Sequence, residues 1–402
     1  MASNDHEHEF SAFKGRPLVR AKNIAGNIAR KLSDLGIHDA EQLVAVASID
    51  DIRRKLADQI GLSESDVGKV ISNAQKTLPD YVSMELQRPQ PADLGLGALE
   101  PTPEMMAEAA ALMAPAPFAA ELAAALPNSV SHIKMMPAIR AQGQRGTCVA
   151  FAMTAVHEFY RITSGNAQDL SEQFLYEETK RIDGSPNACG TWQVKAAQVL
   201  GRLGECREAI WSYNPNLPCN SNGVEPPSAR ADAALFKIQP IVLNPKDVNA
   251  IKGALAGGSA VGFSIPVYNS WYQSAETRRS GRITMRIGGE PSDSGHAMCL
   301  VGYQDDEASP GGGYFILRNS WNTSWGSECP YGAGYGTIPY QYLINDNWEA
   351  VTLPPGHRRI PTPRPPTPRP WPWWPFGEVD GQTSARPTLT IETGGAYDII
   401  VR

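Results

Sequence analysis

The chain has few cysteines, no long apolar run and no strong excess of either charge. Six cysteines in 402 residues, with no Cys-x-x-Cys pair and no zinc-type spacing, favour a reducing compartment without a metal site. A net charge of −6 argues against nucleic-acid binding. The Ala-rich stretch 105–126 is broken by Glu and Pro, and residues 1–10 lack the apolar segment of a secretory signal. We therefore expect a cytoplasmic protein with no metal, cofactor, nucleic-acid or membrane partner.

Proline, in contrast, is abundant and clustered. Residues 354–375 hold ten of the 33 prolines with four arginines and no acid, a composition typical of a polyproline II linker. In the tail that follows, 376–402, two alternating segments flank a Gly-Gly pair and predict a β-hairpin. Three tryptophans in the proline tract are either a recognition motif or part of a semi-rigid spacer: Trp371, Trp373 and Trp374.

The N-terminal part reads as a disordered tail, 1–15, followed by a small helical domain, 16–80. Asp39 and Ser63 are placed to cap the N-termini of two helices, and Gly36 to end another. Apolar residues recur there at helical spacing: Ile24, Ile28, Leu32 and Leu35. The domain loosely resembles a helix-hairpin-helix unit. Residues 1–80 carry 11 Lys and Arg against 12 Asp and Glu, so we expect it to dock a protein or to be structural.

Residues 81–125 are rich in Ala, Pro and Met and form either a linker or a pro-like segment with one or two weak helices. From 126 to 353 the composition is that of one globular domain. Within it, Gly143 and Gly146 mark a tight loop just before Cys148, and a largely apolar run follows that cysteine. Cys148 is therefore expected at the N-terminus of a buried helix, where the helix dipole favours the nucleophilic thiolate.

Two later segments offer partners for this cysteine. His296 opens an apolar strand, and a second strand, Tyr314–Trp321, carries Asn319. A histidine can exchange protons with a thiol and then with a leaving amine, and an asparagine can fix its tautomer and orientation. Cys, His and Asn in this order, with roughly 150 residues between the first two, predict nucleophilic catalysis by a thiol.

Together these blocks resemble the papain and cathepsin family of cysteine peptidases over residues 126–352. They are Gln-Gly-x-x-Gly-x-Cys-x-Ala-Phe, Leu-Ser-Glu-Gln, the histidine strand and Asn-Ser-Trp-x-x-x-Trp-Gly, whereas the family's Cys-x-Gly-Gly stretch is reduced to Cys189-Gly-Thr191. The resemblance implies an α+β fold, with a helical lobe over about 148–225 and an antiparallel β lobe over about 235–350. It also implies roles for other residues: Gln142 in the oxyanion hole, Trp321 over the histidine, Gly190 pairing with substrate backbone and Gly295 lining a roomy or apolar specificity pocket.

The chain also departs from the family. Arg145 stands where the family has a cysteine, and Val149 where it has a tryptophan. The remaining cysteines are expected to be inert. Cys189 and Cys219 are the one pair we consider able to form a bridge, and we predict that they do not.

We therefore predict an endopeptidase that acts on proteins or peptides through a Cys148 thioester. Two alternatives stay open: an inert scaffold that acts through its terminal segments, and a transpeptidase with the same site. The usual inhibitory pro-segment pattern is missing from 16–125. We expect residues 97–125 to lie across or beside the cleft, and the tail 376–402 to dock a partner.

Overall fold

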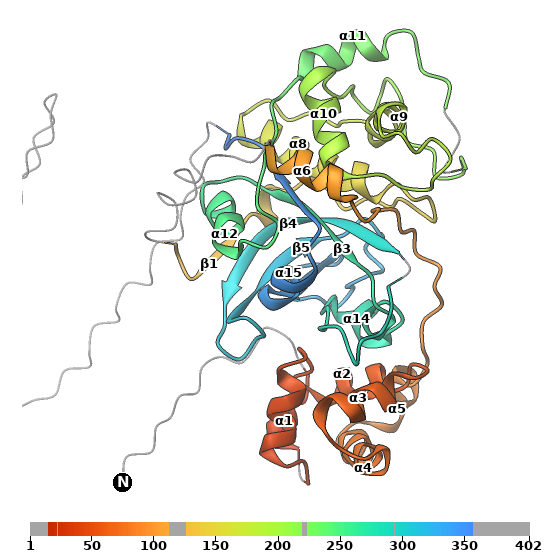
Figure 1. The fold of residues 1–402 in the computed structure, drawn as a ribbon, viewed down its shortest axis with the longest axis vertical. Helices are drawn as coiled ribbons and strands as arrows, with labels where there is room; N and C mark the ends of the chain where they lie inside the picture. Colours follow the sequence, from red (N-terminus) through yellow and green to blue (C-terminus); the bar gives the residue numbers. More distant parts are fainter. Residues whose placement is uncertain (1–14, 22, 112–125, 219–222, 293, 357–402) are drawn as a thin grey trace, which may run out of the picture. The chain divides into compact units, whose positions relative to one another are not determined.

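The structure is a computed structural model that describes residues 15–356, except 22, 112–125, 219–222 and 293. It is an α+β protein with N-terminal helices, a helical lobe and an antiparallel β lobe (Figure 1). This is the predicted fold class. The predicted proline tract, 354–375, lies outside the described residues from position 357 onward, and so does the whole of the predicted tail hairpin.

The N-terminal helices form where the sequence places them. They are α1 (Gly26–Ser33), α2 (Ala40–Ala47), α3 (Ile52–Ile60), α4 (Glu64–Gln75) and α5 (Asp80–Leu86). Asp39 caps α2 by accepting the N–H of Gln42 at 2.9 Å, and Ser63 caps α4 by accepting the N–H of Asp66 at 3.1 Å. Both predicted caps are therefore confirmed.

The short helix α6 (Pro103–Ala111) precedes the two lobes, which begin with strand β1 (Ser129–Ser131). The helical lobe consists of α8 (Cys148–Thr163), α9 (Glu172–Ile182), α10 (Gln193–Arg202) and α11 (Ala229–Ala233). Helix α8 is buried along most of its length because its apolar run leaves few polar positions.

The β lobe is a seven-stranded sheet in which every pairing is antiparallel. The strand order is β2-β7-β3-β4-β5-β6, and β1 also pairs with β4. The strands are β2 (Ile241–Val242), β3 (Val261–Pro266), β4 (Gly295–Asp305), β5 (Gly313–Arg318), β6 (Tyr335–Pro339) and β7 (Glu349–Thr352). The lobe's helices are α12 (Val248–Ala256), α13 (Asn269–Tyr272), α14 (Ala275–Ser280) and α15 (Tyr340–Asp346).

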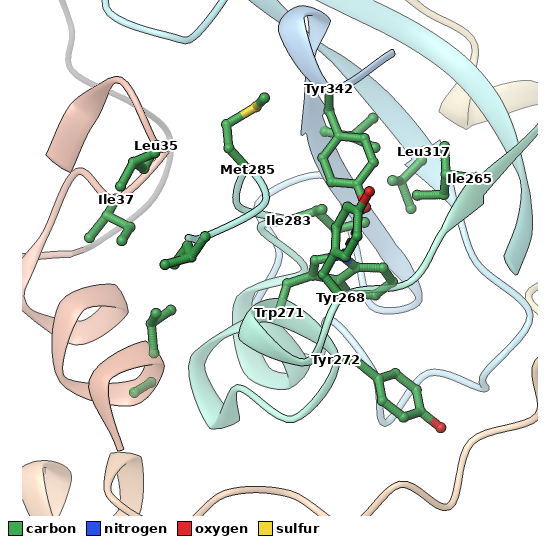
Figure 2. Packing of buried hydrophobic residues seen from close by; sticks show 14 of the residues in the cluster. Leu35, Ile37, Ile265, Tyr268, Trp271, Tyr272, Ile283, Met285, Leu317 and Tyr342 are labelled. Carbon is green, nitrogen blue, oxygen red and sulfur yellow. Dashed lines mark hydrogen bonds between the residues drawn. The ribbon is translucent and has the colours of Figure 1, made fainter. Parts of the chain in front are cut away.

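The N-terminal helices share one apolar core with the β lobe. Figure 2 shows Leu35 and Ile37 on the side of the N-terminal part that faces Ile283 and Met285 of the lobe. The N–H of Met285 donates to the carbonyl oxygen of Leu35 at 2.9 Å. Because this contact buries apolar groups on both sides, it stabilises the arrangement.

A buried ion cluster lies beside this apolar contact. Arg282, between α14 and β4, pairs with Asp39 at 2.5 Å and with Glu276 at 2.9 Å. All three side chains are buried. The pair between Asp39 and Arg282 exists only while the N-terminal helices stay docked, so Asp39 both caps α2 and anchors α2 to the β lobe. No helix in the described part of the chain is long and apolar enough to cross a membrane.

Candidate active site

Cys148 is the first residue of α8 and has no exposed surface. Its Sγ accepts the N–H of Ala297, on β4, at 3.4 Å. Burial raises the pKa of the Cys148 thiol to about 12, although the N–H groups of Ala297, Val149 and Gly97 act in the opposite direction. The thiol is therefore neutral in this conformation.

His296 lies next to Ala297 and is equally buried. Its Nε2 donates to Asn319 Oδ1, with 2.8 Å between them, and the same oxygen accepts the N–H of Ser320 at 2.8 Å. Nδ1 has no hydrogen-bond partner among the described residues. Burial lowers the pKa of His296 to about 4, and the bond to Asn319 partly offsets this. The imidazole is neutral, with Nδ1 left to take a proton.

Trp321 covers the bond between His296 and Asn319. Its ring is stacked on the imidazole with centroids 4.1 Å apart and 16° between the planes. Other aromatic rings enclose it from the side: Trp271, Tyr272 and Trp325. This packing keeps water from the hydrogen bond that orients His296.

Gln142 lies in the loop before α8 and is fully buried. Its Nε2 donates to the carbonyl oxygen of Arg145 at 2.7 Å, and its Oε1 accepts the hydroxyl of Ser320 at 2.6 Å. Ser320 therefore links Gln142 to Asn319, its neighbour in the chain. The sequence analysis gave Ser320 no role. Its position directly after Asn319 could have indicated that it contributes to the site.

Comparison with known proteins decides the family. The model of the papain family of cysteine proteases matches residues 126–338, more than half of the chain. The chain belongs to this family. The resemblance predicted from the sequence is therefore confirmed, as is the prediction of a papain-like cysteine peptidase.

Several known proteins are similar to about half of this chain or more. An uncharacterised peptidase C1-like protein of Acanthamoeba polyphaga mimivirus is 26% identical over 55% of this chain and 68% of its own. Peptidase 1 of Dermatophagoides pteronyssinus is 27% identical over 55% of this chain and 64% of its own. Among solved structures, xylellain, a cysteine protease from Xylella fastidiosa, is similar with a TM-score of 0.53 and 26% identity. That match covers 67% of this chain and 98% of xylellain.

One segment of this papain-family chain crosses its own catalytic site. Residues 95–99, here called the strap, have the sequence Gly-Leu-Gly-Ala-Leu. The N–H groups of Gly97 and Ala98 donate to the carbonyl oxygen of Gly295 at 3.0 and 3.1 Å. The strap presents the N–H of Gly97 to Cys148.

The strap is held at both ends. At its N-terminal end, the Tyr272 hydroxyl donates to the carbonyl oxygen of Leu94 at 2.6 Å, and Trp321 Nε1 donates to the carbonyl oxygen of Gly95, the first residue of the strap, at 2.9 Å. After it, Glu108 on α6 pairs with Lys195 on α10 at 3.0 Å. From the sequence we expected residues 97–125 to lie across or beside the cleft. The segment that does so, the strap, begins two residues earlier, at Gly95. Residues 112–125 lie outside the described residues.

The residue that pairs with the strap here is Thr191, the neighbour of Gly190. Thr191 donates its N–H to the carbonyl oxygen of Gly97 at 2.9 Å and accepts the N–H of Leu99 at 3.1 Å. Gly190 has φ 113°, and a Cβ there would lie 2.3 Å from the Gly97 oxygen. Gly190 thus allows the close approach of the strap, and its pairing with substrate backbone stays a prediction.

Arg145 takes over a structural task at the site. Its buried guanidinium donates to Gln173 at 2.9 Å and pairs with Glu177 at 3.2 Å, and it lies over the rings of Tyr176 and Tyr213. These contacts fix the loop between Gln142 and Cys148. A cationic side chain thus holds this loop at the position where the family resemblance led us to expect a cysteine.

The prediction of six free thiols is wrong. Cys189 is disulfide-bonded, whereas Cys148, Cys206, Cys299 and Cys329 are free. Cys219, the partner considered from the sequence, lies outside the described residues. Within the described ranges, no three His, Cys, Asp or Glu side chains gather into a metal site.

Proposed function

We propose that this chain is an endopeptidase that cleaves peptide bonds through a thioester on Cys148. The observation that carries the proposal is the buried 2.8 Å bond between His296 Nε2 and Asn319 Oδ1, with Ala297 donating to Cys148 Sγ. This bond leaves the unprotonated Nδ1 of His296 for the thiol proton. An inert scaffold has no need for an oriented base next to a buried thiol.

The chemistry follows from these groups. The Cys148 proton passes to His296 Nδ1, and the thiolate sulfur attacks the scissile carbonyl carbon. Gln142 Nε2 and the N–H of Cys148 stabilise the oxyanion, each by about 3 kcal/mol of barrier. The C–N bond breaks as the leaving amine takes the proton from His296. Water, deprotonated by His296, then attacks the thioester and releases the acid and the thiol.

In the described conformation the enzyme is latent. Cys148 and His296 have no exposed surface because the strap covers them. Burial also keeps both groups neutral, so proton transfer between them would create two buried charges. Moving the strap away admits substrate and also hydrates the pair, which lowers the cost of the thiolate and imidazolium forms.

One set of assays tests the function. The full chain, opened by a substitution in the strap, is incubated with a quenched peptide library and with a thiol-directed epoxide, and Cys148→Ala serves as control. Turnover that depends on Cys148 is the expected result. Epoxide labelling of Cys148 without turnover would favour the scaffold. Product ligated to an added amine acceptor, in place of hydrolysis, would favour a transpeptidase.

The partners and the compartment remain predictions. We expect protein or peptide substrates, and a partner for the tail 376–402, so removal of 354–402 should leave cleavage of small peptides unchanged. The bond at Cys189 weighs against the cytoplasm because cytosolic thiols are kept reduced. The alkylation pattern of protein taken from its source cells decides the compartment: a bridged Cys189 indicates an oxidising one.

A further inference from the structure

The glycine just before the catalytic histidine lies under a tryptophan ring. A Cβ built on Gly295 would be 2.2 Å from Cζ3 and 2.8 Å from Cη2 of Trp348. Side-chain atoms do not approach a Cβ this closely, so the ring itself takes up the space beside Gly295. Trp348 therefore fills the space that the missing side chain of Gly295 leaves, and the specificity pocket expected at Gly295 stays a prediction.

The strap marks where a bound peptide would run past this ring. The carbonyl oxygen of Gly295 and both main-chain groups of Thr191 bond to the strap, and Ala98 lies between these two walls. Only 3% of Ala98 is exposed. A peptide substrate has the same main-chain donors and acceptors, so it can pair with the same walls. The Ala98 oxygen would also lie 2.5 Å from a Cβ on Gly295, and Ala98 belongs to the apolar cluster against which Trp348 packs, so Ala98 is the strap residue that holds the place beside this ring.

Trp348 is held firmly in this position. Its N–H donates to the carbonyl oxygen of Ser264, on β3, at 2.9 Å. On one side, Asn347 donates its side-chain amide to the carbonyl oxygen of Pro245 at 2.7 Å. On the other, buried Glu349 accepts the N–H groups of Gln193 and Val194, both at 3.0 Å. With both neighbours fixed, the ring is a wall of the pocket and not a mobile lid.

We propose that Trp348 determines the specificity of this peptidase by closing the pocket beside Gly295. Substrates then carry Gly, Ala or Ser at the position held between Gly295 and Thr191, and branched, aromatic or long side chains are rejected. The apolar surroundings, which include Trp192 and Ala297, give no partner for a charged side chain. The proposal names the substrate class of the proposed function and rests on it.

The first test does not require turnover. In the full chain, Ala98→Phe should push the strap out of the cleft, because a phenyl ring does not fit beside Trp348. The alkylation rate of Cys148 by iodoacetamide, measured by mass spectrometry, should rise by about tenfold or more. Adding Trp348→Ala to Ala98→Phe should make room for the ring and restore slow alkylation. Glu100→Phe, the same ring at an exposed position just past the strap, should have no effect.

The buried free cysteines serve as an internal control for folding. Cys206 and Cys299 should stay unreactive in each variant, since general unfolding would expose them together with Cys148. The proposal is overturned if Ala98→Phe leaves Cys148 as slow as in the wild type. It is also overturned if Trp348→Ala fails to restore slow alkylation in a protein whose other cysteines remain protected.

The second test uses a peptide library on the strap-opened chain. With Trp348 present, small residues should be preferred at the position next to Gly295, and Trp348→Ala should shift the preference toward Leu and Phe by about tenfold to hundredfold. An unchanged preference overturns the proposal. If neither protein cleaves any peptide, the peptidase function fails, and the alkylation test still decides whether Trp348 closes the pocket.

Discussion

Gly97 lies against Gly146 so closely that a Cβ on Gly97 would be 2.2 Å from the Gly146 carbonyl oxygen. The atoms on the other side belong to the main chain of the nucleophile loop, which Gln142 and Arg145 hold in place. A flexible side chain could move aside, but this backbone cannot do so cheaply. The strap therefore reaches the catalytic cysteine only because it has no side chain at this position.

Gly97→Ala should lift the strap and expose Cys148. We expect alkylation of Cys148 by iodoacetamide to become about tenfold faster, since overpacking a tight contact costs on the order of 1–3 kcal/mol. Gly26→Ala is the matched control, because a Cβ there meets no atom within 4 Å. Equal rates in the wild type and in Gly97→Ala would mean that the strap does not block access.

Exposure of Cys148 should also change the pH dependence of its alkylation. Burial raises the pKa of the thiol to about 12 in the closed form, so over roughly pH 6 to 10 only a small thiolate fraction reacts, and this fraction grows with pH. Lifting the strap removes part of the burial and should lower the pKa. The pH–rate profile of Gly97→Ala should therefore level off at a lower pH than that of the wild type. A faster rate with an unshifted profile would indicate a purely steric strap.

The covered bond between His296 and Asn319 predicts a graded loss of catalysis. In the strap-opened protein, Cys148→Ala and His296→Ala should abolish hydrolysis, whereas Asn319→Ala should leave partial activity because Asn319 takes no proton. Trp321→Ala should lower kcat by about tenfold, because the free energy of one aromatic contact corresponds to a change of this size in rate. Trp321→Phe should retain most of the rate. Equal and complete loss in all these variants, with folding intact, would contradict this division of roles.

Removing the charge of Asp39 should destabilise the whole chain. Asp39→Asn keeps an oxygen that can cap α2 but leaves buried Arg282 with one carboxylate fewer. We expect a loss of about 3 kcal/mol in the free energy of unfolding, measured by denaturant titration. Asp66→Asn removes a carboxylate from an exposed pair with Lys69 and should change little. A loss no larger than that of the Asp66 variant would show that the buried cluster is not an anchor.

The catalytic residues were predictable because side-chain chemistry leaves a pattern in the sequence. Cys148 needs glycines before it and an apolar helix after it, and His296 and Asn319 each sit at the end of an apolar strand. The helix caps at Asp39 and Ser63 were predictable for the same reason, since the capping oxygen must precede the first turn.

Features made by the main chain were not predictable in this way. The strap binds through N–H and C=O groups that every residue has, so the sequence Gly-Leu-Gly-Ala-Leu does not identify its contacts. The glycine at position 295 predicts free space beside the histidine. It does not predict that Trp348, 53 residues later, fills that space. Similarly, nothing near Arg145 in the sequence indicated that its partners would be Gln173 and Glu177.

The anchoring of the N-terminal helices has a consequence for any proteolytic activation. The helices up to Leu86 are tied to the β lobe by a shared core and by the Asp39–Arg282 pair, neither of which depends on the connecting peptide. A single cut between α6 and β1 would therefore not free the N-terminal fragment. The activated enzyme would be a nicked species of two polypeptides that elutes as one particle in gel filtration and separates only when denatured.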